Sequence, residues 1–138
     1  FLYFIDIGRF FLLLLLSSYQ SMSLSQATGA NAGILDPSRA PQFLDMMLRR
    51  NRIVMISATY CQFCTKLKLL LIELKHRFVS LEIDIIPNGR ELFSEVVGRT
   101  NAHTVPQVFV GGKYLGGYDD LVSLYKAGEL SKVLERGQ

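Results

Sequence analysis

The two cysteines of this chain, Cys61 and Cys64, are separated by two residues and stand at the boundary between two patterns. Before them lies the apolar run 53–56, which is typical of a buried strand, and after them a long stretch with helical periodicity. Two thiols at this spacing on a strand-to-helix turn are typical of a dithiol redox centre. The N–H groups and the positive dipole end of a first helical turn stabilise a thiolate. We therefore expect Cys61 at the exposed tip and Cys64 one turn further in.

Two other interpretations of the cysteine pair stay open on the sequence. A zinc site needs four ligands, and His76 and His103 are the histidines that could complete it. Alternatively, the two thiols simply fill a core. A single close pair in 138 residues is unlike the disulfide framework of a secreted protein, so we expect a reducing compartment in which the pair cycles. The net charge is only +3, with acids and bases interleaved, and no nucleic-acid partner is expected.

The first residues are predicted to form a segment outside the domain. Residues 1–16 are almost wholly apolar, and the run after Arg9 has the character of a signal-peptide core. This run is shorter than the about 20 residues that a membrane-spanning helix needs. Three interpretations follow: a dispensable leader upstream of a start at Met22, a secretory signal, or an anchor. We divide the chain into a leader with a flexible linker over residues 1–35 and one domain over residues 36–138. A cytoplasmic location is expected, with the secretory pathway as the alternative.

The apolar periodicity of the domain predicts an alternation of helices and strands. Helices are expected over 40–50, over 62–77, from 88 to a stop at Gly98, and from Asp119 onward, with Gly128 before a short terminal turn. Strands are expected over 52–58, 79–85, 108–110 and 113–115. A parallel βαβ unit followed by a helix and a hairpin gives an α/β fold, in which a four-stranded mixed sheet carries helices on both faces.

Local signals set the expected ends of several elements. Asn88 and the glutamate three residues later have the spacing of a capping box. Gly111-Gly112 reads as a two-residue hairpin turn. The alternation of apolar and polar residues over 79–85 places Ile83 and Ile85 on the buried face of their strand.

A second motif, Thr104-Val105-Pro106, comes directly before the third predicted strand. A proline at this point donates no hydrogen bond to a sheet ladder. Taken alone, it could simply lead into the strand. An exposed backbone beside the thiols could also pair with a peptide-like substrate, as the edge of a sheet does. The cysteine pair and Gly116-Gly117 at matching distances favour this second interpretation.

The stretch from about residue 53 to residue 134 resembles a dithiol glutaredoxin, of the thioredoxin-fold family. The matching segments, in the right order, are Cys61–Lys66, Leu81–Asp84, Thr104–Val110 and Gly116–Leu121. The resemblance implies a thioredoxin fold in which the proline of the second motif is cis. It also implies an enzyme that reduces protein disulfides and glutathione mixed disulfides, with glutathione as electron donor and no dedicated metal site.

The resemblance further assigns roles to residues. Cys61 would be the nucleophile, and Cys64 the resolving thiol for protein disulfides. The residues implied in glutathione binding come from three segments: Gln62, Phe63, Thr104, Val105, Pro106, Gly117, Tyr118, Asp119 and Asp120. The Val105 backbone would pair with the cysteinyl part of glutathione, and the segment 117–120 would hold its γ-glutamyl end. A helix N-terminus suits the glutathione carboxylate, and Asp120 can accept from its ammonium.

Some positions depart from the family pattern. Ala58 stands where many members carry a lysine, so that a lysine restored there is expected to raise glutathione-linked turnover. Gln62 stands where a proline is common. The space left open by a non-proline residue would let Cys61 thiolates of two chains, with two glutathione thiolates, bridge a [2Fe–2S] cluster. Such a cluster carrier or sensor, as a minor dimer beside a monomeric enzyme, is the alternative function, and a weakly active domain that holds partners is a third.

Overall fold

A four-stranded sheet organises the part of the chain that the computed structural model describes, residues 39–136. The elements follow in the order α2 (Ala40–Arg50), β1 (Ile53–Ser57), α3 (Gln62–Glu73), β2 (Val79–Glu82), α4 (Gly89–Thr100), β3 (Gln107–Val110), β4 (Lys113–Gly116), α5 (Tyr118–Lys126) and α6 (Leu130–Arg136). The predicted leader, the linker and the boundary at residues 35 and 36 lie outside these described residues.

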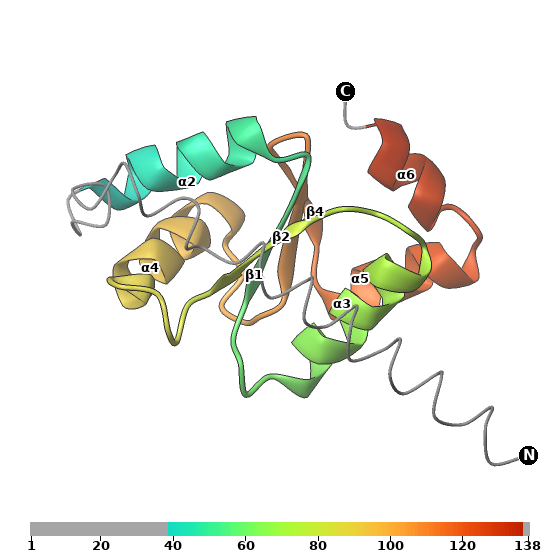
Figure 1. The fold of residues 1–138 in the computed structure, drawn as a ribbon, viewed down its shortest axis with the longest axis horizontal. Coiled ribbons are helices and arrows are strands. Elements are labelled where there is room, and N and C mark those ends of the chain that lie inside the picture. The colour runs from blue at the N-terminus through green and yellow to red at the C-terminus, as the bar shows by residue number, and fades with distance from the viewer. Residues whose placement is uncertain (1–38, 137–138) are drawn as a thin grey trace, which may run out of the picture. The chain divides into compact units, whose positions relative to one another are not determined.

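The strands lie in the order β2-β1-β3-β4, with β1 parallel to β2 and antiparallel to β3, and β3 antiparallel to β4. Figure 1 shows α2 and α4 on one side of the sheet and α3 and α5 on the other. The mixed sheet with helices on both faces is therefore confirmed. In the parallel pair Ser57 lies beside Glu82, so that the loops after β1 and β2 leave the same edge of the sheet.

The central strand β1 is covered on both faces, and all five of its residues are buried. For this reason its sequence is a continuous apolar run rather than an alternation. The largest fully buried apolar side chains come from β1 and β2 and from the inner faces of α2, α3, α5 and α6: Leu44, Ile53, Met55, Ile56, Leu67, Leu71, Leu81, Leu121, Leu130 and Leu134. This packing holds the end of β1, and with it the start of the cysteine loop, in a defined place.

The second strand is shorter than predicted, since β2 ends at Glu82 rather than at residue 85. The chain turns at this point, because the N–H groups of Ile85 and Ile86 both donate to the carbonyl of Glu82, at 3.2 and 3.1 Å. The turn buries Ile86 and leaves Ile85 68% exposed. The prediction that Ile85 lies on the buried face of a strand is therefore wrong.

Three helix ends also differ from the predictions. The helix α3 ends at Glu73, well before residue 77, and Lys75 just beyond it adopts the left-handed conformation with φ 60°. The expected capping box of α4 does not form, because Asn88 has φ 55° and its side chain makes no cap hydrogen bond within the described residues. Gly98 does not stop α4, which continues to Thr100 and ends where Asn101 has φ 57°.

Candidate active site

Cys61 stands where the loop after β1 enters α3. It is the N-cap residue of α3, and its Sγ accepts the N–H of Cys64 at 3.2 Å. Cys61 is partly exposed, whereas Cys64, one turn into the helix, is buried. The placement matches the one expected from the sequence. Cys61 lies in the loop after the C-terminal end of the buried strand β1, and Cys64 lies in the first turn of α3 and faces the core.

The two thiols differ in their electrostatic surroundings. Burial raises the pKa of the Cys64 thiol to about 11, and the hydrogen bond with Cys61 adds to this rise, against lowering contributions from Ala58 and Ser57. Cys64 is therefore protonated at neutral pH in the reduced protein. The Cys61 sulfur is partly exposed and accepts a backbone N–H at the N-terminus of α3. One sulfur is thus accessible from solvent, while the other is buried and protonated.

The loop before β3 lies against the reactive cysteine. The carbonyl oxygen of Val105 is 3.7 Å from Cys61 Sγ and accepts the thiol hydrogen. The Val105–Pro106 peptide bond is cis, as the resemblance implies, and Pro106 is buried. The second sequence motif and the cysteine pair are therefore parts of one site, although they are distant in the chain.

A buried amide holds the proline loop in place. The Gln107 side chain is buried, and its Nε2 donates to the carbonyls of Ala102 and Thr104, at 2.9 and 3.0 Å. Its Oε1 accepts the Thr100 hydroxyl at 2.8 Å, which links the loop to the end of α4. Gln107 is not among the predicted site residues, although a polar residue at the start of an otherwise apolar strand is a usable signal.

The start of α5 forms a third side of the site. Gly116 has φ 148°, and a Cβ atom at this position would lie only 2.6 Å from the Asp120 side chain. The Asp120 carboxylate accepts the N–H of Gly117 at 2.8 Å, which fixes the first turn of α5. The ring of Tyr118 packs on the ring of Phe63 with centroids 5.0 Å apart, and this contact joins α5 to the tip of α3.

The structure thus brings together the three segments that the sequence assigns to one site. The contacts between segments include those of Cys61 with Val105 and of Phe63 with Tyr118, and a Cβ atom added to Gly117 would lie 3.4 Å from the Pro106 carbonyl oxygen. The remaining predicted residues Gln62, Thr104, Asp119 and Asp120 are exposed on the same three segments. The proline loop therefore contacts Cys61 directly, and the first turn of α5 is joined to the start of α3 through Tyr118 and Phe63.

The site contains one contact for which the sequence gives no signal. The Asp84 carboxylate, in the turn after β2, accepts both the N–H of Thr59, at 3.0 Å, and the Thr59 hydroxyl. These hydrogen bonds, the hydroxyl above all, hold the pKa of Asp84 below its usual 3.8. Since Thr59 lies two residues before Cys61, Asp84 ties the loop of the reactive cysteine to the neighbouring strand.

Position 58, where the resemblance leads to an expected lysine, is occupied by a buried alanine. Ala58 is 1% exposed, and its carbonyl accepts the N–H of Cys61 at 3.1 Å. A lysine at this position would have to extend along its aliphatic stem to bring its ammonium into water. In this chain a cation stands instead on α3, where Lys66 Nζ lies 5.5 Å from the centroid of the Phe63 ring.

The zinc alternative finds no support among residues 39–136. This part of the chain contains no group of three or more histidine, cysteine, aspartate or glutamate side chains that could hold a metal ion. The two cysteines therefore do not gather the histidine ligands that a zinc site requires.

The same described residues include no helix long and apolar enough to cross a membrane.

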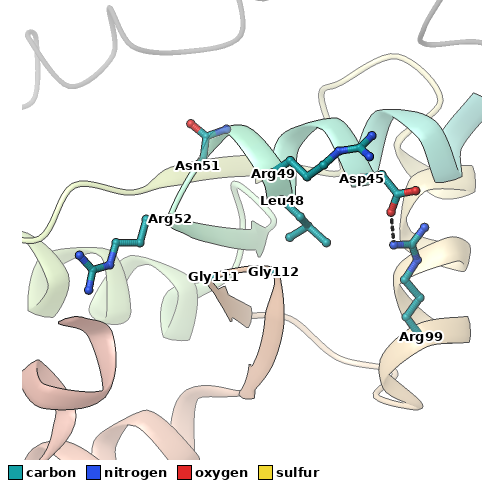
Figure 2. A pocket seen from close by; sticks show the side chains of 8 residues that line it. All are labelled: Asp45, Leu48, Arg49, Asn51, Arg52, Arg99, Gly111 and Gly112. Carbon is teal, nitrogen blue, oxygen red and sulfur yellow. Dashed lines mark hydrogen bonds and ion pairs between the residues drawn. The ribbon is translucent and has the colours of Figure 1, made fainter. Parts of the chain in front are cut away.

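A separate hollow of about 730 Å³ opens at the other end of the sheet. Figure 2 shows its lining side chains and the ion pair between Asp45 and Arg99, at 2.5 Å. The lining residues are Asp45, Leu48, Arg49, Asn51, Arg52, Arg99, Gly111 and Gly112. The register places this hollow far from the thiols, because Ile53 at the start of β1 pairs with Val110 and the cysteines follow the opposite end of the strand. It is therefore not part of the candidate active site.

Two thiols of unequal burial, one helical turn apart, can exchange with a disulfide and then close on each other. A thioredoxin-fold sheet that carries such a pair beside a cis proline defines the class of thiol–disulfide oxidoreductases. The comparisons with known proteins agree with this class. The family model described as glutaredoxin matches residues 53–115.

Individual relatives extend the match over most of the chain. The chain is 36% identical to the chloroplastic glutaredoxin-C4 of Oryza sativa subsp. japonica, over 83% of this chain and 89% of the relative. It is also 36% identical to glutaredoxin-C4 of Arabidopsis thaliana, over 94% and 89%. Among solved structures, a buckwheat glutaredoxin–glutathione complex matches with a TM-score of 0.70 and 31% identity, over 73% of this chain and 92% of that chain. The chain belongs to the glutaredoxin family.

Proposed function

We propose that this protein is a glutathione-dependent oxidoreductase that reduces glutathione mixed disulfides and protein disulfides. The observation that carries the proposal is the difference between the two thiols, with Cys61 partly exposed at a helix N-terminus and Cys64 buried beneath it. A single accessible sulfur is enough for exchange with a mixed disulfide. The buried sulfur becomes necessary only when the reactive cysteine must be released from a protein.

With a glutathione mixed disulfide as substrate, the reaction needs only Cys61. Its thiolate attacks the glutathione sulfur, the substrate S–S bond breaks, and the client sulfur leaves as a thiolate that takes a proton from water. Cys61 is left in a disulfide with glutathione. A second glutathione thiolate attacks this disulfide, forms oxidised glutathione and returns Cys61 as a thiolate. The net result is that one reduced glutathione combines with the glutathionyl group of the substrate to form oxidised glutathione, while the client thiol is released in its reduced form.

With a protein disulfide as substrate, Cys64 completes the reaction. Cys61 attacks one client sulfur and becomes joined to the client through a mixed disulfide. Cys64 then loses its proton to solvent and attacks Cys61 Sγ, so that the client leaves reduced and a Cys61–Cys64 disulfide remains. The high pKa of Cys64, about 11, keeps this thiol protonated and unreactive until that step. Two glutathione molecules reduce the internal disulfide.

The glutathione-binding site that we propose, called the glutathione seat below, consists of three segments: the start of α3, the proline loop before β3 and the start of α5. The backbone of Val105, whose carbonyl already contacts Cys61, is placed to pair with the cysteinyl residue. The first turn of α5 offers N–H groups to the γ-glutamyl carboxylate, with Asp119 and Asp120 as acceptors for its ammonium. The buckwheat relative has been solved as a complex with glutathione, which supports the same ligand here.

Other parts of the functional prediction have less structural support. A [2Fe–2S] cluster would need thiolates from a second chain and from glutathione, and no contact in the described residues favours it. The monomeric state of the enzyme also stays a prediction. A reducing compartment such as the cytoplasm suits a dithiol that is recycled by glutathione, and this location is part of the proposal.

A coupled assay tests the proposed function. The full chain is incubated with reduced glutathione, glutathione reductase, NADPH and the mixed disulfide of glutathione with free cysteine. Saturable NADPH oxidation that depends on the protein is expected. A parallel reaction replaces glutathione and its reductase by thioredoxin reductase, and no turnover is expected there. Turnover with thioredoxin reductase alone, or no turnover in either reaction, would contradict the proposal.

A further inference from the structure

Two large apolar side chains in the loops that follow β1 and β2 are largely exposed. Tyr60 is 80% exposed and Ile85 is 68% exposed, the largest values among the bulky apolar side chains of the described residues. Single exposed apolar residues are ordinary on a protein surface. Two of them beside one reactive sulfur are a different case, because apolar area gathered at a binding site is available to a partner.

Hydrogen bonds join the two loops that carry these side chains. Tyr60 directly follows Thr59 and precedes Cys61, and Ile85 directly follows Asp84. The Asp84 carboxylate accepts the Thr59 N–H at 3.0 Å and also the Thr59 hydroxyl. The two loops continue parallel strands and leave the same edge of the sheet, as Figure 1 shows. The backbones that carry Tyr60 and Ile85 are therefore joined to each other close to Cys61 in the chain.

The core does not need either side chain. The buried positions of the two loops are taken by their neighbours, Ala58 before Tyr60 and Ile86 after Ile85, which are 1% and 8% exposed. The turn after β2 is what directs Ile85 outward, since the N–H of Ile85 donates to the Glu82 carbonyl at 3.2 Å. The apolar surface of Tyr60 and Ile85 is thus presented to solvent by the backbone and is free to contact a partner.

We propose that Tyr60 and Ile85 form a docking surface for protein substrates, and that they favour a disulfide-bearing polypeptide with apolar residues next to its reactive cysteine. The inference rests on the proposed function, because the occupant is set by the chemistry of Cys61. A mixed disulfide between Cys61 and a client brings the client backbone next to Cys61. Tyr60 directly precedes Cys61 in the chain and therefore lies close to that backbone. The glutathione seat lies on Val105 and α5, so this surface can be filled while glutathione uses the other side.

The proposal distinguishes two kinds of substrate at one sulfur. A small disulfide such as that of glutathione with cysteine has no chain that could reach both Tyr60 and Ile85. A polypeptide with apolar residues beside its cysteine buries part of their surface in the complex. We expect kcat/KM to be about tenfold higher for the apolar substrate. The free energy gained by partly burying one apolar side chain is equivalent to about this factor.

The experiment compares three substrates with four proteins. Two synthetic peptides carry one intramolecular disulfide each, and their attacked cysteine is flanked by leucine in one and by serine in the other. The third substrate is the mixed disulfide of glutathione with cysteine. The proteins are the wild type, Tyr60→Ser, Ile85→Ser and, as matched control, Leu69→Ser, which replaces a 46% exposed apolar side chain of α3. The measured quantity is kcat/KM for the leucine peptide divided by that for the serine peptide, so that intrinsic differences between the peptides cancel between proteins.

The wild type and Leu69→Ser are expected to share the same ratio, and Tyr60→Ser and Ile85→Ser each to lower it by about threefold or more. All four proteins should reduce the glutathione–cysteine disulfide equally well. An unchanged ratio in both loop variants would overturn the proposal, and so would an equal loss in Leu69→Ser. A loop variant that loses activity on all three substrates alike would also overturn it, because the side chain would then serve the site and not the client. Failure of the wild type on the glutathione–cysteine disulfide would instead contradict the proposed function.

Discussion

At the scale of single residues, Asp84 links the loop of the reactive cysteine to the neighbouring strand. Its two hydrogen bonds with Thr59 hold its pKa below 3.8 even though the side chain is exposed. A carboxylate whose pKa is lower in the folded than in the unfolded protein stabilises the fold above the unfolded pKa. This contribution is lost as the pH falls through the folded pKa. The contribution of Asp84 is therefore complete at neutral pH and disappears only below about pH 3.8.

We predict that Asp84→Asn makes the stability of the protein less sensitive to acid. Because the amide has no proton to gain in this range, the free energy of unfolding should fall less between about pH 5 and about pH 2 than it does in the wild type. Urea unfolding at several pH values measures this difference. Glu73→Gln, which changes an exposed carboxylate at the end of α3, should follow the wild-type curve. An Asp84→Asn curve parallel to that of the wild type would show that the hydrogen bonds with Thr59 do not form.

At the scale of elements, two glycines differ in whether the structure requires them. Gly116 has φ 148° and leaves no room for a Cβ atom, which would lie 2.6 Å from the Asp120 side chain. Gly98 lies inside α4, with no atom within 4 Å of the position of a Cβ. The first glycine is required by the close contact between the end of β4 and the start of α5. The second merely weakens a helix, since glycine is a poor helix former.

These two positions give opposite predictions for the same substitution. Gly116→Ala should lower the free energy of unfolding by about 1–3 kcal/mol, because alanine is strained at this φ and clashes with Asp120. It should also raise KM for glutathione, since the first turn of α5 belongs to the proposed seat. Gly98→Ala should raise the free energy of unfolding by about 0.5–1 kcal/mol and leave KM unchanged. Chemical denaturation and the coupled assay measure both quantities, and a stable, fully active Gly116→Ala would contradict this description of the site.

The elements also show what a sequence pattern can and cannot predict. The apolar run of β1, the helical periodicity of α3 and the glycine pair 111–112, with φ of 55° and 78°, predict a strand, a helix and a hairpin turn that the structure contains. Periodicity fails at Ile85, because hydrogen bonds to the Glu82 carbonyl turn the chain while the apolar alternation continues. The contact of Asp84 with Thr59 joins residues far apart in the sequence, and no local pattern encodes it. The cysteine pair and the proline loop could be predicted because each carries its own residue signature.

At the scale of the whole molecule, residues 39–136 contain a complete sheet with helices on both of its faces. The fully buried residues of β1, α3 and α5 pack within this part of the chain. An ion pair between Asp45 and Arg99, at 2.5 Å, and one between Lys68 and Glu82, at 2.5 Å, join elements of the same part. The more exposed Asp45–Arg99 pair contributes little, so most of the stability comes from the two apolar layers.

We predict that deleting residues 1–22 leaves the stability and the activity of the protein nearly unchanged. The buried core residues of the described part of the chain run from Ala40 to Leu134, beyond that segment. The midpoint of thermal unfolding should shift by less than about 4 °C, which is equivalent to less than about 1 kcal/mol for a domain of this size. Differential scanning calorimetry of the full chain and the shortened chain compares them directly. A larger fall in the midpoint would mean that the deleted segment contributes to the core.

The central claim about this protein is that Cys61 is the nucleophile and Cys64 the resolving thiol. It follows from the partly exposed position of Cys61 at the N-cap of α3 and from the burial of Cys64, whose pKa is raised to about 11. An accessible thiolate is required for every exchange, while the buried thiol is required only to release a protein client.

The most direct measurement is therefore the rate of Cys61→Ser and Cys64→Ser on two substrates, a glutathione mixed disulfide and a peptide with an intramolecular disulfide. Cys61→Ser should be inactive on both. Cys64→Ser should reduce the mixed disulfide at a rate similar to that of the wild type, and should remain covalently joined to the peptide, which mass spectrometry detects. If Cys61→Ser keeps activity on the mixed disulfide while Cys64→Ser loses it, the assignment of nucleophile and resolving thiol is wrong.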